Sequence, residues 1–159
     1  MIPIATTRFN QETWNSNKRW RDRNNWEGCI YGSPVIIKKE IPLMIPMFVL
    51  EMNNDINNIV GIGLVKNTIE KKQKYKIYEW GNYNRYIYKG KCRIDRENLD
   101  KEEIKIIEIL DMLLFKGSRH LKRGQGLIMI PKWIETNKHI DFKKKILEMF
   151  KTRFKDNEY

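Results

Sequence analysis

Two apolar runs separated by a polar turn constrain the fold of this chain more than any other feature. The first run belongs to IPLMIPMFVLEMNN (Ile41–Asn54) and the second is IVGIGLVKN (Ile59–Asn67). The Asn and Asp residues between them tolerate the left-handed backbone of a tight turn. The two runs therefore predict a buried β-hairpin. Gly61 and Gly63 leave one face of its second strand without side chains, which permits the close approach of another segment.

Two later segments predict helices. DKEEIKIIEILDMLLFKG begins with a capping box, Asp100 with Glu103, and stops at Gly117. Its apolar stripe consists of Ile104, Ile107, Leu110, Leu113 and Leu114. Residues 141–156 carry Phe or Ile at every fourth position, which is typical of an amphipathic helix packed on the rest of the fold. Its apolar positions are Phe142, Ile146, Phe150 and Phe154.

The remaining segments carry weaker patterns. Residues 1–27 show no sustained periodicity, and we interpret them as an ordered N-terminal arm. Residues 70–94 alternate in part between cations and Tyr or Ile, which predicts two strands joined around EWGNYN. SRHLKRGQGLIMIPKWI (Ser118–Ile134) reads as a basic loop that leads into a closing strand. This order predicts one α+β domain over residues 1–159, a small barrel or half-barrel of about five or six mostly antiparallel strands with flanking helices.

The charge of the chain points to polyanionic partners. A formal charge of +11 and a pI near 9.6 favour RNA, DNA or an anionic membrane surface. A hydrophobic fraction of 41% and an aromatic fraction of 11% exclude a disordered basic tail. No apolar run approaches the roughly 20 residues of a membrane span, and no secretory signal is recognisable. We therefore expect an intracellular protein, cytoplasmic or nuclear, that binds nucleic acid and no membrane.

The same composition argues against metal and cofactor chemistry. Cys29 and Cys92 are the only cysteines, and the two histidines lie far apart, so no zinc pattern exists. We expect no metal and no cofactor.

Catalytic motifs are weak. The chain has neither a Gly-Lys-Ser/Thr phosphate loop nor a Gly-x-Ser-x-Gly elbow. Glu51 and Asp55 are acids that a metal nuclease could use, but we expect the first on a strand surface and the second in the hairpin turn. His120 beside Lys122 and Arg123 could act as a general acid–base group in RNA cleavage. We assign no catalytic residue, and a small nuclease remains an alternative.

The tryptophans allow two interpretations. Trp14, Trp20 and Trp26 recur every six residues, so they cannot all face one way in one regular element. Each can cover the core or stack on a base, and both possibilities stay open. Trp80 lies beside a glycine in a loop and is harder to explain as core, whereas Trp133 is expected in the core.

Basic residues form three groups. One accompanies the first tryptophans, one is a run of lysines between residues 71 and 76, and one surrounds Gly124 and Gly126. Backbone amides exposed beside glycines, with cations around them, suit phosphate oxygens. The residues expected to contact phosphates are Arg19, Arg21, Arg23, Arg85, Arg119, His120, Lys122 and Arg123.

Three stretches resemble known nucleic-acid-binding domains. WEGCIYGSP, followed by an apolar strand and VLEMNNDINNIVGIGLV, resembles the EVE domain of the PUA-like superfamily. The pattern of an apolar strand, an Asn-containing turn and a glycine-containing strand is also similar to the YTH domain. GQGLIMIPKWIET is similar to the closing strand of an EVE domain. The resemblance covers roughly residues 24–66 and 117–136. In place of the family's Val-Arg-Asn, this chain has Cys29 and Ile30 without an arginine.

The resemblance implies a PUA-like barrel that reads a modified, methylated nucleobase in an aromatic pocket. The pocket residues would be Trp26, Tyr31, Ser33, Trp80, Asn82 and Tyr83. Single-stranded RNA is slightly favoured over DNA, because extruding a base from a duplex costs a few kcal/mol. The alternative is a basic RNA- or DNA-binding protein that uses the same residues for stacking and charge, without base selectivity.

Overall fold

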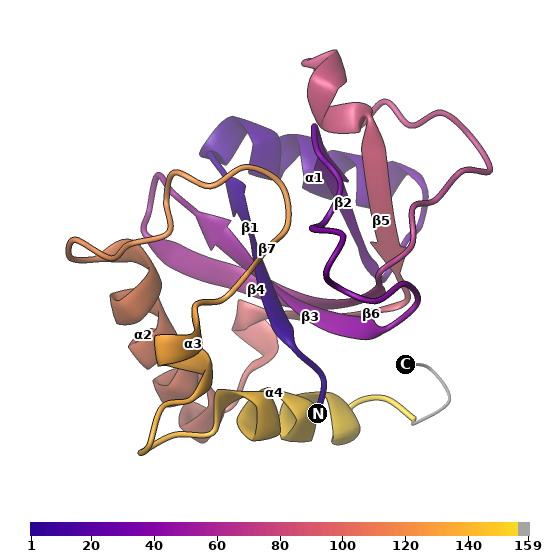
Figure 1. The fold of residues 1–159 in the computed structure, drawn as a ribbon. Coiled ribbons are helices and arrows are strands. Elements are labelled where there is room, and N and C mark those ends of the chain that lie inside the picture. Colours follow the sequence, from indigo (N-terminus) through magenta and orange to yellow (C-terminus); the bar gives the residue numbers. More distant parts are fainter. Residues whose placement is uncertain (156–159) are drawn as a thin grey trace.

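The computed structural model describes residues 1–155 (Figure 1). The elements in chain order are β1 (Ile4–Phe9), α1 (Gln11–Arg23), β2 (Cys29–Ser33), β3 (Pro46–Asn53), β4 (Asn58–Lys66), η1 (Gly81–Asn84), β5 (Tyr86–Gly90), β6 (Cys92–Asp95), η2 (Arg96–Asn98), α2 (Lys101–Phe115), β7 (Ile128–Met129), α3 (Lys132–Glu135) and α4 (Phe142–Lys151). Within residues 1–155 the strands form a five-stranded sheet, in the order β6-β4-β3-β1-β7, and a two-stranded sheet of β2 and β5. The α+β class is confirmed, but this part of the chain contains no single closed barrel.

The predicted hairpin is confirmed as β3 and β4. Phe48 lies opposite Leu64 and Leu50 lies opposite Ile62 across the antiparallel pair. The turn between the strands contains Asn57 at a φ of 54°, a backbone conformation that asparagine adopts more readily than most residues. The hairpin forms the centre of the five-stranded sheet, with β6 beside β4 and β1 beside β3.

The interpretation of residues 1–27 as an arm is wrong. β1 lies inside the five-stranded sheet, parallel to β3 and antiparallel to β7. Its periodicity is obscured because Thr6 and Thr7 are buried among the apolar residues. α1 follows at once, and its N-terminus is capped by Asn10 and Thr13, each of which accepts a hydrogen bond from the backbone N–H of the other.

The helix α1 has no apolar stripe to reveal it. Its buried residues are the polar Asn17 and Arg21, with Trp14 and Trp20 half-buried. An amphipathic helix is normally recognised by apolar residues at a 3.6-residue period. Because α1 packs through polar and aromatic side chains instead, hydrophobic periodicity does not identify it.

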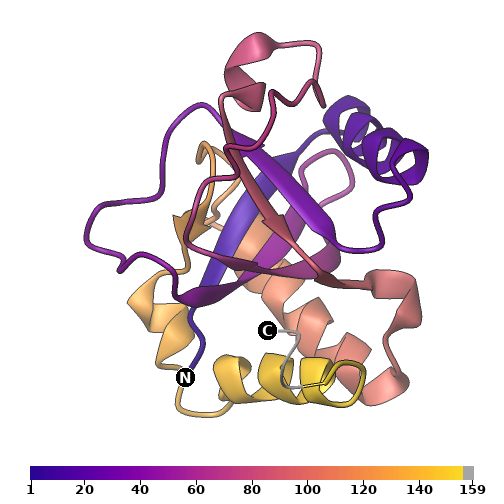
Figure 2. The same cartoon turned by 90° about the vertical axis from the view of Figure 1, so that its right-hand side faces the viewer.

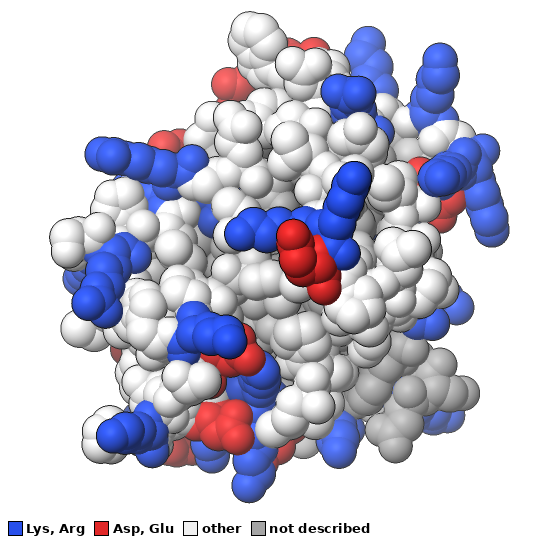
Figure 3. All heavy atoms as spheres, in the orientation of Figure 1, with Lys and Arg blue, Asp and Glu red and all other residues white. Residues whose placement is uncertain are grey.

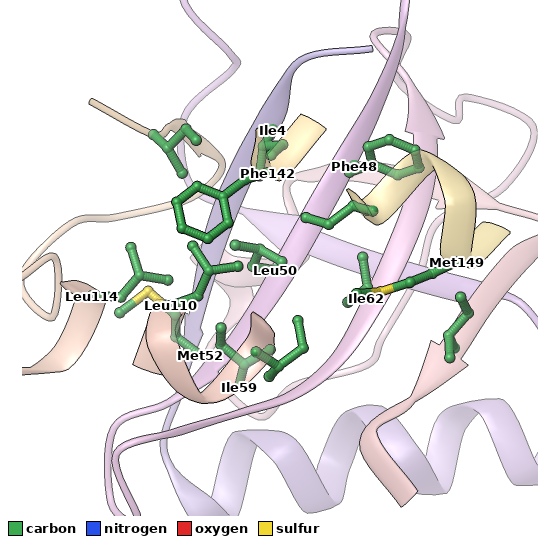
Figure 4. Close-up of a cluster of buried hydrophobic side chains, with 14 of the residues drawn as sticks. Ile4, Phe48, Leu50, Met52, Ile59, Ile62, Leu110, Leu114, Phe142 and Met149 are labelled. Atoms are coloured by element: carbon green, nitrogen blue, oxygen red, sulfur yellow. The ribbon is translucent and has the colours of Figure 1, made fainter. Parts of the chain in front are cut away.

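The helices α2 and α4 cover one face of the five-stranded sheet, as Figures 1 and 4 show. The Asp100–Glu103 capping box is confirmed, and Gly117 adopts a φ of 79° just beyond the end of α2. The core beneath the two helices contains Ile4, Phe48, Leu50, Ile62, Leu110, Leu114, Phe142 and Met149 (Figure 4). The C-terminal helix ends at Lys151, earlier than predicted, and residue 156 of the predicted helix lies outside the described residues.

The two-stranded sheet packs on the opposite face together with α1. Its buried residues include Tyr31 and Tyr88, which belong to the same hydrophobic cluster as Met47, Val49 and Val65 of the hairpin. Residues 67–80, expected to include a strand, are irregular, whereas β5 and β6 follow one another directly. Each of these two strands pairs in a different sheet, β5 with β2 and β6 with β4.

The expected closing strand is much shorter than predicted. β7 contains two residues, and Trp133 lies in the short helix α3. The prediction that Trp133 is in the core is wrong, because its side chain is 38% exposed and lies under Arg119, whose guanidinium carbon is 5.4 Å from the ring centroid.

Candidate functional site

A cleft of about 470 Å³ opens where three segments meet: the junction of β1 and α1, residues 78–83, and the basic loop (residues 118–127). We call it the Trp80 cleft. Its side chains include Arg8, Phe9, Asn10, Glu12, Thr13, Ser16, Asn54, Tyr78, Glu79, Trp80, Tyr83, Lys122, Arg123 and Gln125. In Figure 1 these segments lie in the upper half of the fold, away from α4.

Two exposed aromatic rings form one wall of the cleft. Trp80 is 73% exposed, and Tyr83 beside it is also exposed. Asn84 holds this segment in place, because its side-chain oxygen accepts hydrogen bonds from the backbone N–H groups of Ile77 and Tyr78, each at 2.9 Å. Its side-chain nitrogen also donates to the carbonyl of Tyr78 at 2.7 Å. The backbone that carries Trp80 and Tyr83 is therefore held by hydrogen bonds, although both side chains are exposed to solvent.

The basic loop forms another part of the lining and is fixed by Arg8 of β1. The guanidinium of Arg8 donates to the carbonyls of Leu121 at 3.1 Å and Gly126 at 2.8 Å. Asn54, the residue that follows β3, donates to the carbonyl of Lys122 at 2.8 Å. Lys122 and Arg123 thus reach the cleft from a loop that β1 and β3 both hold.

Arg8 is a partly buried cation. None of the salt bridges within residues 1–155 joins it to a carboxylate. Burial lowers its pKa to about 10, so the side chain stays charged at neutral pH. Its Nε atom is buried and has no hydrogen-bond partner within that range. Arg8 is not among the site residues predicted from the sequence, although it is the only charged residue in the stretch IATTRF.

Replacing Arg8 by methionine is expected to free the basic loop, because the carbonyls of Leu121 and Gly126 lose a charged donor. We expect amide hydrogen exchange in residues 121–127 to become at least tenfold faster, while exchange in β3 and β4 changes little. The exposed Arg19, whose guanidinium reaches only Ser16 among the described side chains, provides the control when replaced by methionine. Unchanged exchange in the loop of the Arg8 variant would contradict this role.

The structure brings together four of the residues expected at the site: Trp80, Tyr83, Lys122 and Arg123 all line the Trp80 cleft. Asn82 is exposed in η1 next to Tyr83 and does not line the cleft. His120 lies in the basic loop just outside it, and its Nδ1 accepts a hydrogen bond from the backbone N–H of Lys122 at 3.2 Å.

Other expected pocket residues lie elsewhere. Tyr31 is 1% exposed and donates a hydrogen bond to Glu51 at 2.6 Å, so it offers no surface to a ligand. Ser33 is buried and its hydroxyl donates to the carbonyl of Val35. Trp26 lies near the other end of β2, with its Nε1 donating to the carbonyl of Cys29 and the ammonium of Lys89 4.1 Å from its ring centroid.

The expected phosphate contacts are similarly dispersed. Arg21 is buried over the ring of Trp14, at 5.2 Å. Arg85 lies over Tyr86, at 5.1 Å, and Arg119 lies over Trp133. The exposed Arg19 and Arg23 lie on α1 and do not line the Trp80 cleft. Figure 3 shows further cations projecting at the upper right, where Figure 1 places residues 67–80.

Glu51, considered above as a nuclease ligand, is buried in an ionic network. Arg93 binds its carboxylate through Nε at 2.9 Å and Nη2 at 2.6 Å. Burial alone would lower the pKa of Arg93, but the charge and hydrogen bonds of Glu51 outweigh it and raise the pKa above its ordinary value. The glycine face of β4 makes room for this network, because a Cβ on Gly61 would lie 2.5 Å from Oε1 of Glu51 and one on Gly63 would lie 2.1 Å from the hydroxyl of Tyr31. The expectation that Glu51 lies on the strand surface is wrong.

The described part of the chain holds no group of three or more His, Cys, Asp and Glu side chains that could bind a metal ion. No helix in residues 1–155 is long and apolar enough to cross a bilayer. Comparison of the chain with protein-family models, with curated proteins and with solved structures gives no match.

Proposed function

We propose that this protein binds single-stranded nucleic acid and holds one nucleotide in the Trp80 cleft. The observation that carries the proposal is that two exposed aromatic residues, Trp80 and Tyr83, line the same cleft as two cations, Lys122 and Arg123. Trp80 and Tyr83 supply flat surfaces for a base, and Lys122 and Arg123 supply charge for the phosphates that flank it. Stacking of a base on an aromatic side chain contributes about 1–3 kcal/mol and tolerates any sequence.

The polar residues of the cleft add a means of selecting the base. Glu12 and Glu79 also line it, and carboxylates accept hydrogen bonds from the exocyclic amino groups of adenine, cytosine and guanine. Uracil and thymine lack such an amino group. A single strand suits this arrangement better than a duplex, because no pairing has to be broken before the base enters.

The resemblance to EVE and YTH domains supports a finer proposal: that the fold is a variant of the PUA-like fold and that the selected base is methylated. The aromatic wall then consists of Trp80 and Tyr83. Trp26 and Tyr31 have no part in it, since Tyr31 is buried and Trp26 lies near the other end of β2.

The test is binding to short single-stranded oligonucleotides, with and without N6-methyladenine or 5-methylcytosine, in RNA and DNA, over a range of salt concentrations. We expect binding that weakens as salt rises, because phosphate contacts release counterions. We further expect at least a tenfold preference for one modified base, about 1.4 kcal/mol, which persists at high salt.

Each outcome has a distinct meaning. Equal affinity for all strands, lost uniformly with salt, would leave a non-selective binder and remove the methylated-base proposal. No binding to any strand at low salt would overturn the nucleic-acid proposal altogether.

A further inference from the structure

The connection from β2 to β3 carries an unusual concentration of exposed aliphatic side chains. Within residues 1–155, Val35, Ile36, Leu43 and Met44 are among the exposed large hydrophobic residues, and Leu43 is the most exposed of them at 79%. Figure 2 shows this connection looping out from the body of the protein at the left. We call residues 34–45 the aliphatic loop. Clustered exposed apolar residues mark interaction sites more often than single ones do.

The aliphatic loop is fixed although its side chains are exposed. Asn67, just after β4, donates through its side chain to the carbonyls of Ile41 and Pro42, each at 3.0 Å. Its backbone carbonyl accepts from the N–H of Met44 at 3.0 Å. The backbone N–H of Ile37 donates to the hydroxyl of Tyr88 at 3.0 Å. The loop therefore presents its apolar side chains in a defined arrangement.

The backbone at Met44 is strained in the same loop. Its φ of 67° lies in the left-handed region, which costs a side-chain-bearing residue about 1 kcal/mol or more. Leu43 and Met44 gain no burial in return, since both remain exposed. The strained backbone at Met44 therefore does not stabilise the fold through burial of these side chains. A binding surface that covers Leu43 and Met44 explains both the strain and the exposure better.

Lysines surround the exposed aliphatic residues. Lys38, Lys39 and Lys71 line the same groove as Ile36 and Leu43, and Glu40 is the only acid in the aliphatic loop. This combination of charge and apolar side chains is complementary to a surface that is anionic outside and apolar beneath. Lysines near an anionic bilayer contribute about 1 kcal/mol each to binding.

We propose that the aliphatic loop binds the surface of an anionic lipid bilayer, with Leu43 and Met44 in the acyl region and the lysines at the headgroups. Protein interfaces are depleted in lysine and enriched in aromatic residues. The aliphatic loop has two lysines and no aromatic residue, so its composition does not favour a protein partner. A nucleic acid is also a poorer partner, because bases stack on aromatic side chains and not on aliphatic ones. This inference departs from the sequence expectation that no membrane is a partner, and it concerns a surface contact, not a span.

The experiment is co-flotation with vesicles of phosphatidylcholine alone and of phosphatidylcholine with 30% phosphatidylserine. We expect the protein to bind the anionic vesicles and not the neutral ones. Combining L43D with M44D is expected to lower the partition coefficient at least tenfold, as is combining K38E with K39E. All variants are first checked by circular dichroism for an unchanged spectrum.

Two matched controls separate the loop from general charge attraction. Ile56 in the β3–β4 turn is 52% exposed, close to the 56% of Met44, and I56D should bind like the wild type. Lys144 and Lys145 are exposed on α4, and K144E with K145E should reduce binding less than the change at Lys38 and Lys39. Absence of binding to anionic vesicles would overturn the proposal, as would binding that L43D with M44D leaves intact.

Discussion

Replacing Glu51 by glutamine is expected to lower the free energy of unfolding by about 3–5 kcal/mol, because it leaves the guanidinium of Arg93 buried without its main charge partner. Burial raises the pKa of Tyr31 well above its ordinary value, so its hydroxyl keeps its proton and donates to Glu51. The substitution therefore disturbs two buried partners at once. Urea unfolding followed by circular dichroism measures the change.

Asp95 provides the matched control for this substitution. It also contacts Arg93, at 3.1 Å, but its side chain is far more exposed than that of Glu51. Asp95→Asn should cost about 1 kcal/mol or less, because the Asp95 side chain is 35% exposed and Arg93 keeps Glu51 as its buried partner. If Glu51→Gln does not fold, the double variant Glu51→Met, Arg93→Met provides a second measurement, since replacing a buried pair by apolar residues is often neutral. A loss below about 1 kcal/mol for Glu51→Gln, or a double variant less stable than the single one, would contradict the assigned role.

Replacing Trp80 by alanine is expected to weaken binding of single-stranded oligonucleotides roughly tenfold to a hundredfold, the range that loss of one stacked base corresponds to. Because Trp80 is 73% exposed, its removal should change the free energy of unfolding little. The affinity is measured by fluorescence anisotropy of a labelled oligonucleotide, and stability by urea unfolding of the same samples.

Trp133 provides a matched control of the same residue type. It is also exposed and lies beside a cation, Arg119, but it does not line the Trp80 cleft. Trp133→Ala should leave oligonucleotide affinity within about twofold of the wild type. Equal losses of affinity in the two variants would mean that any exposed tryptophan on this basic protein contributes to oligonucleotide binding. The Trp80 cleft would then not be the binding site.

The residues of the candidate site differ in how far the sequence could predict them. Trp80 lies in an irregular segment as the sequence predicts, because a tryptophan beside a glycine has few reasons to be buried, whereas Tyr83 lies in the short helix η1. Tyr31 was expected to face a ligand, yet it faces Glu51, twenty residues further along the chain. Nothing local distinguishes an exposed tyrosine from one whose hydroxyl reaches a buried carboxylate. The role of Arg8 is hidden for the same reason, since its partners in the basic loop lie more than a hundred residues away.

The sequence by itself determined the central hairpin, the start and stop of α2, the C-terminal amphipathic helix and the strongly basic charge. Each of these follows from side chains within a few residues of one another, through turn conformation, capping and periodicity. The tertiary structure alone decided that β1 enters the sheet beside β3, that α1 packs through polar residues, and that the basic loop lines the same cleft as Trp80. These features depend on pairings and buried hydrogen bonds between residues distant in the chain, and such partners leave no local periodicity in the sequence.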